Sequence, residues 1–310
     1  MAQLSWLEAG VIGLVQGVSE LFPVSSLGHS ILIPALVGGR WAQDLSVSAP
    51  ESPYLAFIVG LHVATAIALV VFFRRDWVRI VRGLVTSIRD RRVTGPDQRL
   101  AWLLVLATIP VGIAGLLLEH LVRTVFGRPV PAAVFLVLNG LVLGAAEFLR
   151  RRPAAPAPVP PGSATPDTGD DGAAEGSDRR IAALSVRSAV LVGSAQIAAL
   201  LPGISRSGST MVAGRIRGLD HEDAARFSFL LATPVILAAG VLKLPDLAGP
   251  LGDGIRPQVL FGSVLSGLGA YVSVKYLTRW FQTRTLTPFA VYCVLAGLAS
   301  LAVFAVRGTS

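Results

Sequence analysis

An apolar stretch near the start of the chain carries side chains that could perform acid–base or nucleophilic chemistry. Gln16 and Glu20 are four residues apart, so they share one face of a helix. Ser25 and Ser26 end a Pro-Val-Ser-Ser cluster that follows, and they fall within one turn of His29. A carboxylate inside a membrane is unfavourable by a few kcal/mol, so Glu20 indicates a functional site. The alternative, that the serines and the histidine only satisfy broken backbone, leaves Glu20 unexplained.

A second stretch, PGISRSGST at residues 202–210, is suited to binding an anion. Gly203 and Gly208 allow the backbone to approach a ligand closely. A helix that restarts here directs free N–H groups towards the break, and Arg206 offers a fork of donors that matches phosphate. The alternative is a structural ion pair between Arg206 and Glu20. The first stretch thus supplies a carboxylate, a hydroxyl and an imidazole, and the second supplies a binding site for an anion. Phosphoryl transfer needs these groups, because positioning and charge neutralisation dominate that reaction.

The composition places these groups in a membrane. Of the 310 residues, 53% are hydrophobic and only 15% are charged, against about 25% charged in an average soluble domain. The net charge of +8 comes from basic residues in short loops between apolar blocks, so nucleic-acid binding is excluded. The single cysteine, Cys293, excludes a disulfide within the chain.

Six apolar stretches of about 20 residues predict transmembrane helices. Two further apolar stretches, roughly 4–37 and 186–215, are broken at their centres by Gly, Ser and Pro. We interpret each as two half-helices that enter the membrane and return on the same side, because irregular backbone at that depth must line a cavity or be buried in protein. The six predicted spans are Tyr54–Phe73, Leu100–Leu118, Ala132–Leu149, Ala224–Leu242, Val259–Leu277 and Leu286–Val306.

The distribution of basic residues predicts the orientation in the membrane. If residues 74–99, 150–187, 215–226 and 275–285 are cytoplasmic, 20 basic residues lie inside and 6 lie outside. Arg206 belongs to neither group. This bias predicts that both termini are outside.

The chain divides into two similar halves. Residues 153–178 are rich in Pro, Ala, Gly and acids, which predicts a disordered cytoplasmic linker between a first repeat (1–152) and a second (179–310). A shift of 180 residues lays GLVQGVSELFPVSSLGHS (13–30) over GSAQIAALLPGISRSGST (193–210). Each half is one hairpin followed by three spans, an odd number, so the second half is inverted. The prediction is an all-α polytopic membrane protein with six transmembrane helices and two re-entrant hairpins in an inverted-topology repeat, whose two breaks meet.

The segments QGVSELFPVSSLGHS and PGISRSGST resemble the two signature motifs of the undecaprenyl-diphosphate phosphatases, the bacitracin-resistance type of integral membrane phosphatase. AARFSFLL, at residues 224–231, resembles a third family segment, and the similarity extends over nearly the whole chain apart from the linker. The resemblance implies hydrolysis of a polyprenyl diphosphate lipid to the monophosphate in a bacterial plasma membrane, at a site open to the outer face. It implies a divalent cation, Mg²⁺ or Ca²⁺, and it allows a homodimer.

The resemblance also implies roles for individual residues. Glu20 matches the invariant motif acid, and Gln16 matches a position that is Glu in many members, so these two would hold the metal together with substrate phosphates. Ser26, activated by His29, is the expected nucleophile, and the alternative is His29 itself. Arg206 would clamp the diphosphate. The expected substrate-binding residues are Ser25, Gly203, Ser205, Ser207, Gly208 and Thr210.

Two other functions are compatible with parts of the pattern. Inverted repeats with broken helices are equally typical of a transporter, such as a flippase for the same lipid or an anion carrier. A carrier has no use for a nucleophile and a base, so Glu20, Ser26 and His29 favour the enzyme. A scaffolding protein would tolerate the loss of every polar intramembrane side chain.

Overall fold

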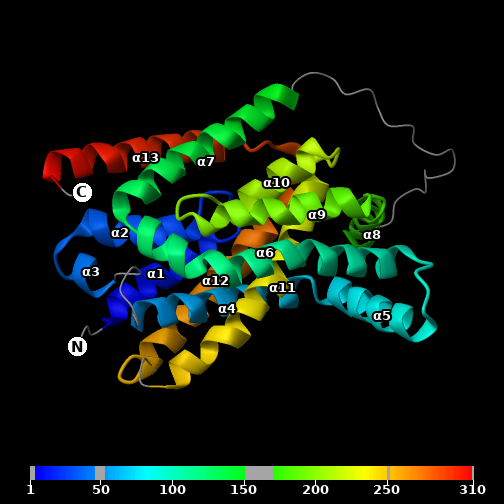
Figure 1. Cartoon of the computed structure of the whole chain (residues 1–310), viewed down its shortest axis with the longest axis horizontal. Coiled ribbons are helices and arrows are strands. Elements are labelled where there is room, and N and C mark those ends of the chain that lie inside the picture. Colours follow the sequence, from blue (N-terminus) through cyan, green and yellow to red (C-terminus); the bar gives the residue numbers. More distant parts are fainter. Residues whose placement is uncertain (1–3, 46–52, 151–169, 250–251, 309–310) are drawn as a thin grey trace.

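The computed structural model describes residues 4–45, 53–150, 170–249 and 252–308, and every regular element in these ranges is helical (Figure 1). The first half contains α1 (Trp6–Ser19), α2 (Ser26–Val37), α3 (Gly39–Asp44), α4 (Pro53–Phe72), α5 (Arg74–Asp90), α6 (Pro96–Phe126) and α7 (Pro129–Arg150). The second half contains α8 (Asp170–Ala182), α9 (Val186–Ser194), the 3₁₀ helix η1 (Ala195–Leu200), α10 (Arg206–Ile216), α11 (His221–Ala248), α12 (Arg256–Thr283) and α13 (Thr287–Arg307).

The long helices identify a multi-pass membrane protein. Within the described ranges, five helices, α6, α7, α11, α12 and α13, are long and apolar enough to cross a membrane. Two bent pairs raise the number to seven if each pair is one span: α4 with α5, bent by 87°, and α8 with α9 and η1, bent by 103°. Their outward faces carry large apolar side chains, such as Leu116 and Leu117 of α6 at 73% and 74% exposed. Lipid is the solvent that suits such faces.

Both broken stretches are interrupted where the sequence predicts. Residues 20–25 separate α1 from α2, and residues 201–205 separate η1 from α10. Pro23 and Pro202 cannot donate a backbone hydrogen bond, and Gly203 adopts a φ of +107°, so neither segment can continue a helix.

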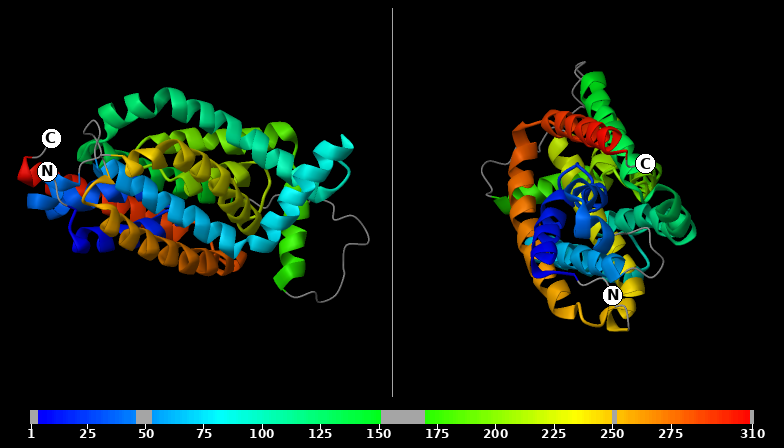
Figure 2. Two further views of the ribbon diagram at one scale, coloured as in Figure 1. Left: turned by 90° about the horizontal axis from the view of Figure 1, so that it is seen from below. Right: turned by 90° about the vertical axis from the view of Figure 1, so that its left-hand side faces the viewer.

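Helices of the two halves pack against each other rather than forming two separate bundles. The pair α7 and α13 lies side by side, as do α4 and α11 (Figures 1 and 2). The first arm of each broken stretch packs on a long helix of the opposite half, α1 on α12 and α9 on α6. Glycines make these contacts close: a Cβ on Gly13 would lie 2.5 Å from the Gly262 carbonyl oxygen, and one on Gly193 would lie 2.0 Å from that of Ala107.

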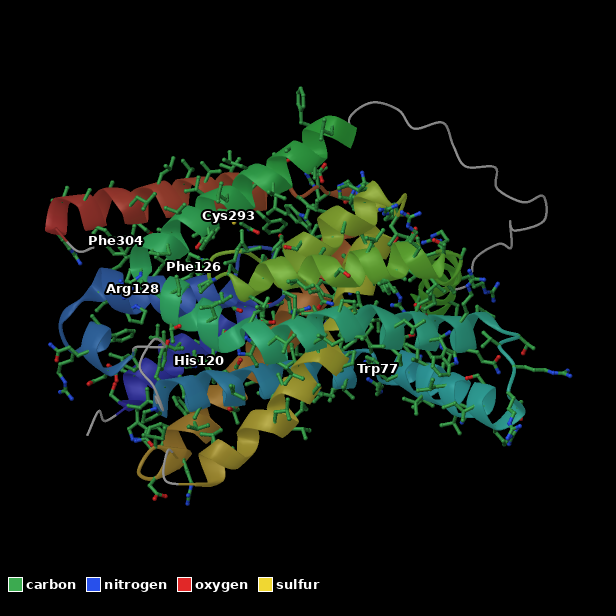
Figure 3. The ribbon with its side chains drawn as sticks, in the orientation of Figure 1. Trp77, His120, Phe126, Arg128, Cys293 and Phe304 are labelled. Atoms are coloured by element: carbon green, nitrogen blue, oxygen red, sulfur yellow. The ribbon has the colours of Figure 1, made fainter. Side chains whose placement is uncertain are left out.

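The two ends of the bundle differ in character. Figure 2 shows both chain ends together at one end of the molecule, with α5 and α8 at the other. Figure 3 likewise places Arg128 and Phe304 near the end with the termini, and Trp77 on the side of the opposite end. Described residues of all four segments predicted to be cytoplasmic lie together at this second end, in α5, in α8, at the start of α11 and at the end of α12.

The C-terminal part of the predicted linker is helical. Residues 153–169 lie outside the described residues, but residues 170–178 belong to α8, so the expectation of disorder there is wrong. Asp178 accepts hydrogen bonds from Arg79 at 2.6 Å and from Arg226 at 2.7 Å, and the Ser177 hydroxyl donates to Asp223. These buried polar contacts dock α8 on α5 and α11, which its composition could not reveal.

Candidate active site

The first break positions Glu20, Ser25 and Ser26 through local capping. Glu20 is the C-cap residue of α1, and Ser25 is the N-cap residue of α2, with its Oγ accepting a hydrogen bond from the Gly28 N–H at 3.2 Å. Ser25 has a φ of +68°, an uncommon conformation for a residue with a side chain, and such strain is concentrated at functional sites. The turn brings Ser26 back towards the end of α1.

The second break is built in the same way. Ser205 is the N-cap residue of α10, and its Oγ accepts a hydrogen bond from the Gly208 N–H at 3.1 Å. Gly203 has no room for a side chain, because a Cβ would lie 2.3 Å from the Ala132 carbonyl oxygen. Because Ser205 is the N-cap residue, Arg206 is the first residue of α10, and the N-terminus of this helix faces the break.

The structure brings the two breaks into direct contact, as the sequence predicts. Arg206 Nη2 donates to Glu20 Oε1 at 3.0 Å, and the Gly203 N–H donates to Ser25 Oγ at 3.2 Å. Asn139 of α7 joins both segments, since its amide nitrogen donates to the Pro23 carbonyl at 3.0 Å and its amide oxygen accepts from the Ser205 N–H at 3.0 Å.

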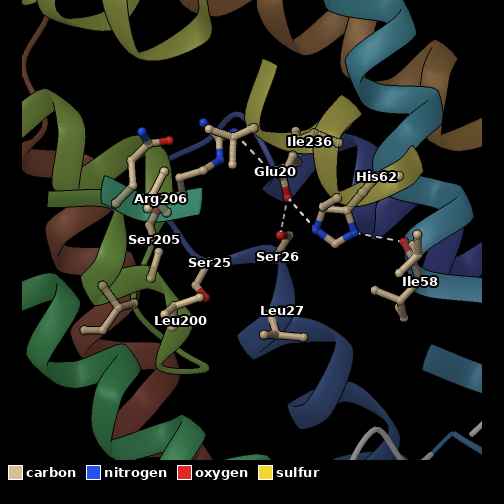
Figure 4. Close-up of a pocket in the computed structure, with 18 residues that line it drawn as sticks. Glu20, Ser25, Ser26, Leu27, Ile58, His62, Leu200, Ser205, Arg206 and Ile236 are labelled. Atoms are coloured by element: carbon tan, nitrogen blue, oxygen red, sulfur yellow. Dashed lines mark hydrogen bonds and ion pairs between the residues drawn. The ribbon is translucent and has the colours of Figure 1, made fainter. Parts of the chain in front are cut away.

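The carboxylate of Glu20 is the centre of this contact. Besides Arg206, it accepts a hydrogen bond from Gln16 Nε2 at 3.0 Å. It also faces His62 Nε2 at 3.2 Å and accepts a hydrogen bond from the Ser26 hydroxyl (Figure 4). Its side chain is 5% exposed. A buried carboxylate needs such donors to remain ionised, and here they include a guanidinium.

His62 of α4 stands between two acceptors. Its Nδ1 lies 2.8 Å from the Ile58 carbonyl oxygen, and its Nε2 points to Glu20 (Figure 4). His62 belongs to the predicted span Tyr54–Phe73, and the only sequence signal for it is a polar side chain in an apolar helix.

His29 lies apart from the Ser26 hydroxyl. Its Nδ1 is 2.7 Å from the Ser25 carbonyl oxygen, and its Nε2 is 2.7 Å from the Tyr292 hydroxyl of α13. Neither ring nitrogen faces Ser26 Oγ, so the expected activation of Ser26 by His29 is not the arrangement in this structure. The hydroxyl of Ser26 is directed to Glu20 instead.

A cavity of about 280 Å³ opens beside these groups. Glu20, Ser26, His62 and Arg206 line it. The rest of the lining is the amide of Gln196, the two N-cap serines of the breaks, and aliphatic side chains that come mainly from α4, η1 and α11. Arg206 Nη1 is buried and has no hydrogen-bond partner in the described part of the chain. A buried guanidinium nitrogen without a partner is unfavourable, so this donor is available for a phosphate oxygen.

The other predicted substrate-binding residues divide into two groups. Ser25 and Ser205 line the cavity. The remaining four lie behind its wall, where Thr210 bonds to Ser228 at 2.6 Å and Ser207 bonds to the Phe22 carbonyl at 3.3 Å. Their contacts with substrate stay a prediction, and these are Gly203, Ser207, Gly208 and Thr210.

Two oxygen donors in the site are suited to a divalent cation. The carboxylate of Glu20 is a hard ligand, and the side-chain oxygen of Gln16 beside it is buried without a hydrogen-bond partner among the described residues. No cluster of three His, Cys, Asp or Glu side chains occurs in the described ranges. Gln16 and Glu20 therefore fit a cation that takes its remaining ligands from phosphate and water.

Known proteins resemble this chain over almost its whole length. The family described as Bacitracin resistance protein BacA matches residues 9–299. A protein of Mycolicibacterium paratuberculosis named undecaprenyl-diphosphatase is 67% identical over 306 residues, which cover 99% of each chain. Undecaprenyl-diphosphatase 1 of Frankia casuarinae is 56% identical, covering 96% of this chain and 97% of its own. Undecaprenyl-diphosphatase 2 of Chromobacterium violaceum is 41% identical, covering 95% and 97%.

Proposed function

Since the chain belongs to the bacitracin resistance protein BacA family, we propose that it hydrolyses undecaprenyl diphosphate to the monophosphate and inorganic phosphate where its two broken stretches meet. The observation that carries this proposal is the Arg206–Glu20–Ser26 contact, which places a nucleophile and a carboxylate beside an arginine with a free donor. The reaction recycles the lipid carrier of cell-wall synthesis and gives resistance to bacitracin.

The site residues divide the work of phosphoryl transfer. The Ser26 oxygen attacks the terminal phosphorus while its proton passes to Glu20, and the bond to the bridging oxygen breaks to release the polyprenyl monophosphate. Water then attacks the phosphoserine, which releases inorganic phosphate and restores Ser26. Arg206 neutralises the phosphate oxygens throughout. His29 as the nucleophile remains the alternative, with Tyr292 orienting its ring.

His62 and Gln16 hold the carboxylate in place during these steps. Each directs a side-chain nitrogen to Glu20 Oε2, the oxygen that also accepts from Ser26. Because little covalent assistance is needed in a loose phosphoryl-transfer transition state, correct placement of Ser26 matters more than the basicity of Glu20.

Gln16 and Glu20 would hold the divalent cation. Bound there, Mg²⁺ or Ca²⁺ supplies positive charge to the diphosphate. Treatment with EDTA should abolish phosphate release, and added Mg²⁺ or Ca²⁺ should restore it. Full activity after exhaustive chelation would contradict a cation at this site.

The inverted repeat of six spans and two re-entrant hairpins is supported by reciprocal contacts. A Cβ on Gly140 of α7 would lie 2.6 Å from the Ala290 carbonyl oxygen of α13, and one on Gly297 of α13 would lie 2.9 Å from that of Ala133 of α7. A single shift of 157 residues relates both pairs. The glycine of each helix therefore contacts the same alanine position of the other helix, as expected if a two-fold axis relates two inverted halves.

The proposed setting is the bacterial plasma membrane, with both termini and the opening of the site on the outer face. The 20 basic residues on the opposite side support this orientation. The undecaprenyl tail would extend along the aliphatic side of the cavity, and a homodimer remains an expectation from the family.

Phosphate release by purified protein in detergent tests the proposed function. With farnesyl or undecaprenyl diphosphate, the wild type should turn over, and Arg206→Ala should lower kcat about a thousandfold because it removes the charge that neutralises phosphate. Glu20→Ala and Ser26→Ala should also abolish turnover.

Ser209→Ala is the matched control, because Ser209 belongs to the same motif but does not line the cavity. It should retain activity. Full activity in all three site variants would reject this site, and absence of release by the wild type in detergent would favour a transporter.

A further inference from the structure

A second cavity, of about 330 Å³, lies where α4 bends into α5. It is bordered by Phe72 of α4, by α8, by the first turns of α11 and by Tyr271 and Lys275 of α12. It shares no lining residue with the catalytic cavity. On α4 the two are separated by the ten residues from His62 to Phe72, about 15 Å along a helix. This cavity therefore has no part in the proposed hydrolysis.

The α12 wall of this cavity is cationic. Lys275 and Arg279 are four residues apart, so they project from the same face of the helix. Both are exposed, and neither has an ion-pair partner in the part of the chain that the structure describes. Gln282 lies beside them and adds an amide donor, while the Thr278 hydroxyl donates to the Val274 carbonyl at 2.9 Å and leaves its oxygen on the cavity wall. This wall can bind a phosphate through several donors.

The carboxylates on the opposite side do not cancel these two charges. Asp76 is already paired with Arg79 at 2.7 Å and with Arg226 at 3.0 Å. Glu222 is half-buried and contributes one negative charge. The two unpaired cations outnumber it, so the cavity as a whole favours an anion.

The cavity lies at the boundary between lipid and water. Directly beside Lys275 on α12, Val272 and Leu268 are 67% and 61% exposed and Tyr276 is 49% exposed. This pattern is typical of a lipid-facing helix that ends in an interfacial aromatic residue. The aromatic rings of Phe72 and Tyr271 line the cavity and pack edge to face with their centroids 5.8 Å apart. An acyl chain can follow these rings out to the bilayer.

The orientation of helix α5 also indicates that the cavity lies at the boundary between lipid and water. It is bent by 87° from α4, so it runs along the membrane plane rather than across it. Val78, Val81, Val85 and Ile88 form an exposed apolar stripe on it, each 52–59% exposed. Arginines flank this stripe. An amphipathic helix of this kind lies in the headgroup region, with its apolar face towards the acyl chains.

We propose that this cavity binds the headgroup of an anionic glycerophospholipid from the cytoplasmic leaflet, with the phosphodiester between Lys275 and Arg279. Basic pockets between transmembrane helices on this side are recognised sites for such headgroups. The bound lipid would join α12, α11 and the α4–α5 bend at the end of the bundle opposite the termini.

Native mass spectrometry of the full chain in detergent tests this site. Phosphatidylglycerol is titrated against wild type and Lys275→Ala/Arg279→Ala, with phosphatidylcholine as the zwitterionic lipid and glycerol 3-phosphate as the headgroup without chains. The control variant Arg91→Ala/Arg92→Ala removes the same charge from an exposed turn outside the cavity.

The wild type and the control should retain phosphatidylglycerol at equal affinity, and the cavity variant should bind about tenfold to thirtyfold more weakly. Phosphate release by both variants should match wild type, which shows that they are folded. Equal binding by cavity variant and wild type, or an equal loss in the control, would overturn the site. Equal affinity for phosphatidylcholine, or full displacement by glycerol 3-phosphate, would overturn its specificity for an anionic lipid.

Discussion

At the scale of single residues, Glu20 determines what the site can do. Its two carboxylate oxygens accept from side chains of α1, α2, α4 and α10, so one acid holds four elements in register. The same contacts direct the Ser26 hydroxyl and leave Arg206 Nη1 free for substrate. Each neighbour of Glu20 should therefore affect turnover through the placement of Ser26.

His62 provides one such test. His62→Ala removes a charge-assisted hydrogen bond of about 1.5–3 kcal/mol, which should lower kcat about tenfold to a hundredfold with little change in KM. His62→Gln retains one donor and should recover most of the loss. Steady-state phosphate release measures both. Wild-type kcat in His62→Ala, or no recovery in His62→Gln, would show that His62 does not position Glu20.

The identity of the nucleophile gives a second prediction. Because Ser26 contacts Glu20 while His29 faces Tyr292, substrate labelled in the terminal phosphate should leave the label on Ser26. Rapid acid quenching followed by mass spectrometry detects it, since phosphoserine survives acid and phosphohistidine does not. Label that is lost in acid and retained in base would favour His29.

The central residues of the site could be predicted from sequence, and their supporting neighbours could not. Glu20, Ser26 and Arg206 are unusual in apolar segments, where polar groups are unfavourable. Asn139 is likewise a polar residue in an apolar segment of α7, but the sequence does not indicate which backbone groups it hydrogen-bonds. Tyr292 gives none, because an interfacial tyrosine in a span is ordinary.

At the scale of helices, close packing between opposite halves positions the two breaks. The contact of α9 with α6 depends on Gly193, and the α1 contact with α12 depends on Gly13. Asn139 then fixes the breaks to α7. These contacts explain how irregular segments can hold reactive side chains steadily.

Enlarging Gly193 should therefore damage the fold. In Gly193→Ala the new Cβ meets the Ala107 carbonyl oxygen at 2.0 Å, which forces α9 from α6 and should destabilise the protein by about 1–3 kcal/mol or more. Gly112→Ala in α6 is the control, since its Cβ meets no atom within 4 Å. Thermal midpoints in detergent compare them, and equal midpoints would contradict this packing.

Helix α8 offers a separate prediction at this scale. Asp178→Ala removes the α8 carboxylate that Arg79 and Arg226 share, while Asp76 still pairs with both arginines, so the cost is the loss of hydrogen bonds to a charged group, about 1.5–3 kcal/mol each. We expect α8 to detach locally, so limited proteolysis near residues 170–182 should become faster while phosphate release persists. Unchanged cleavage would show that other contacts hold α8.

The length of the apolar stretches predicted the long helices, and the clusters of Gly, Ser and Pro predicted both breaks. The sequence reading treated residues 74–99 as a basic loop, although residues 74–90 form α5. It also assigned the start of α8 to the linker. Both helices are held by contacts with distant residues, such as Asp178 with Arg79, and local composition does not contain that information.

At the scale of the whole molecule, both chain ends lie together and the linker end lies opposite (Figure 2). The 20 basic residues predict that the linker end is cytoplasmic. Labelling with a membrane-impermeant maleimide tests this in intact cells: Ser310→Cys should react and Ser163→Cys should not. Native Cys293 is buried and provides an unlabelled background. The reverse pattern would contradict the orientation.

The pairing of Glu20 with Arg206 spans 186 residues of chain. During synthesis at about 5–20 residues per second, the acid emerges on the order of ten to forty seconds before its guanidinium exists. Until then the first hairpin carries a carboxylate that Gln16, Ser26 and His62 can hydrogen-bond but that no guanidinium neutralises. The nascent hairpin should therefore wait near the headgroups and settle at its final depth only when the second half arrives, so insertion and activation are completed by the same late event.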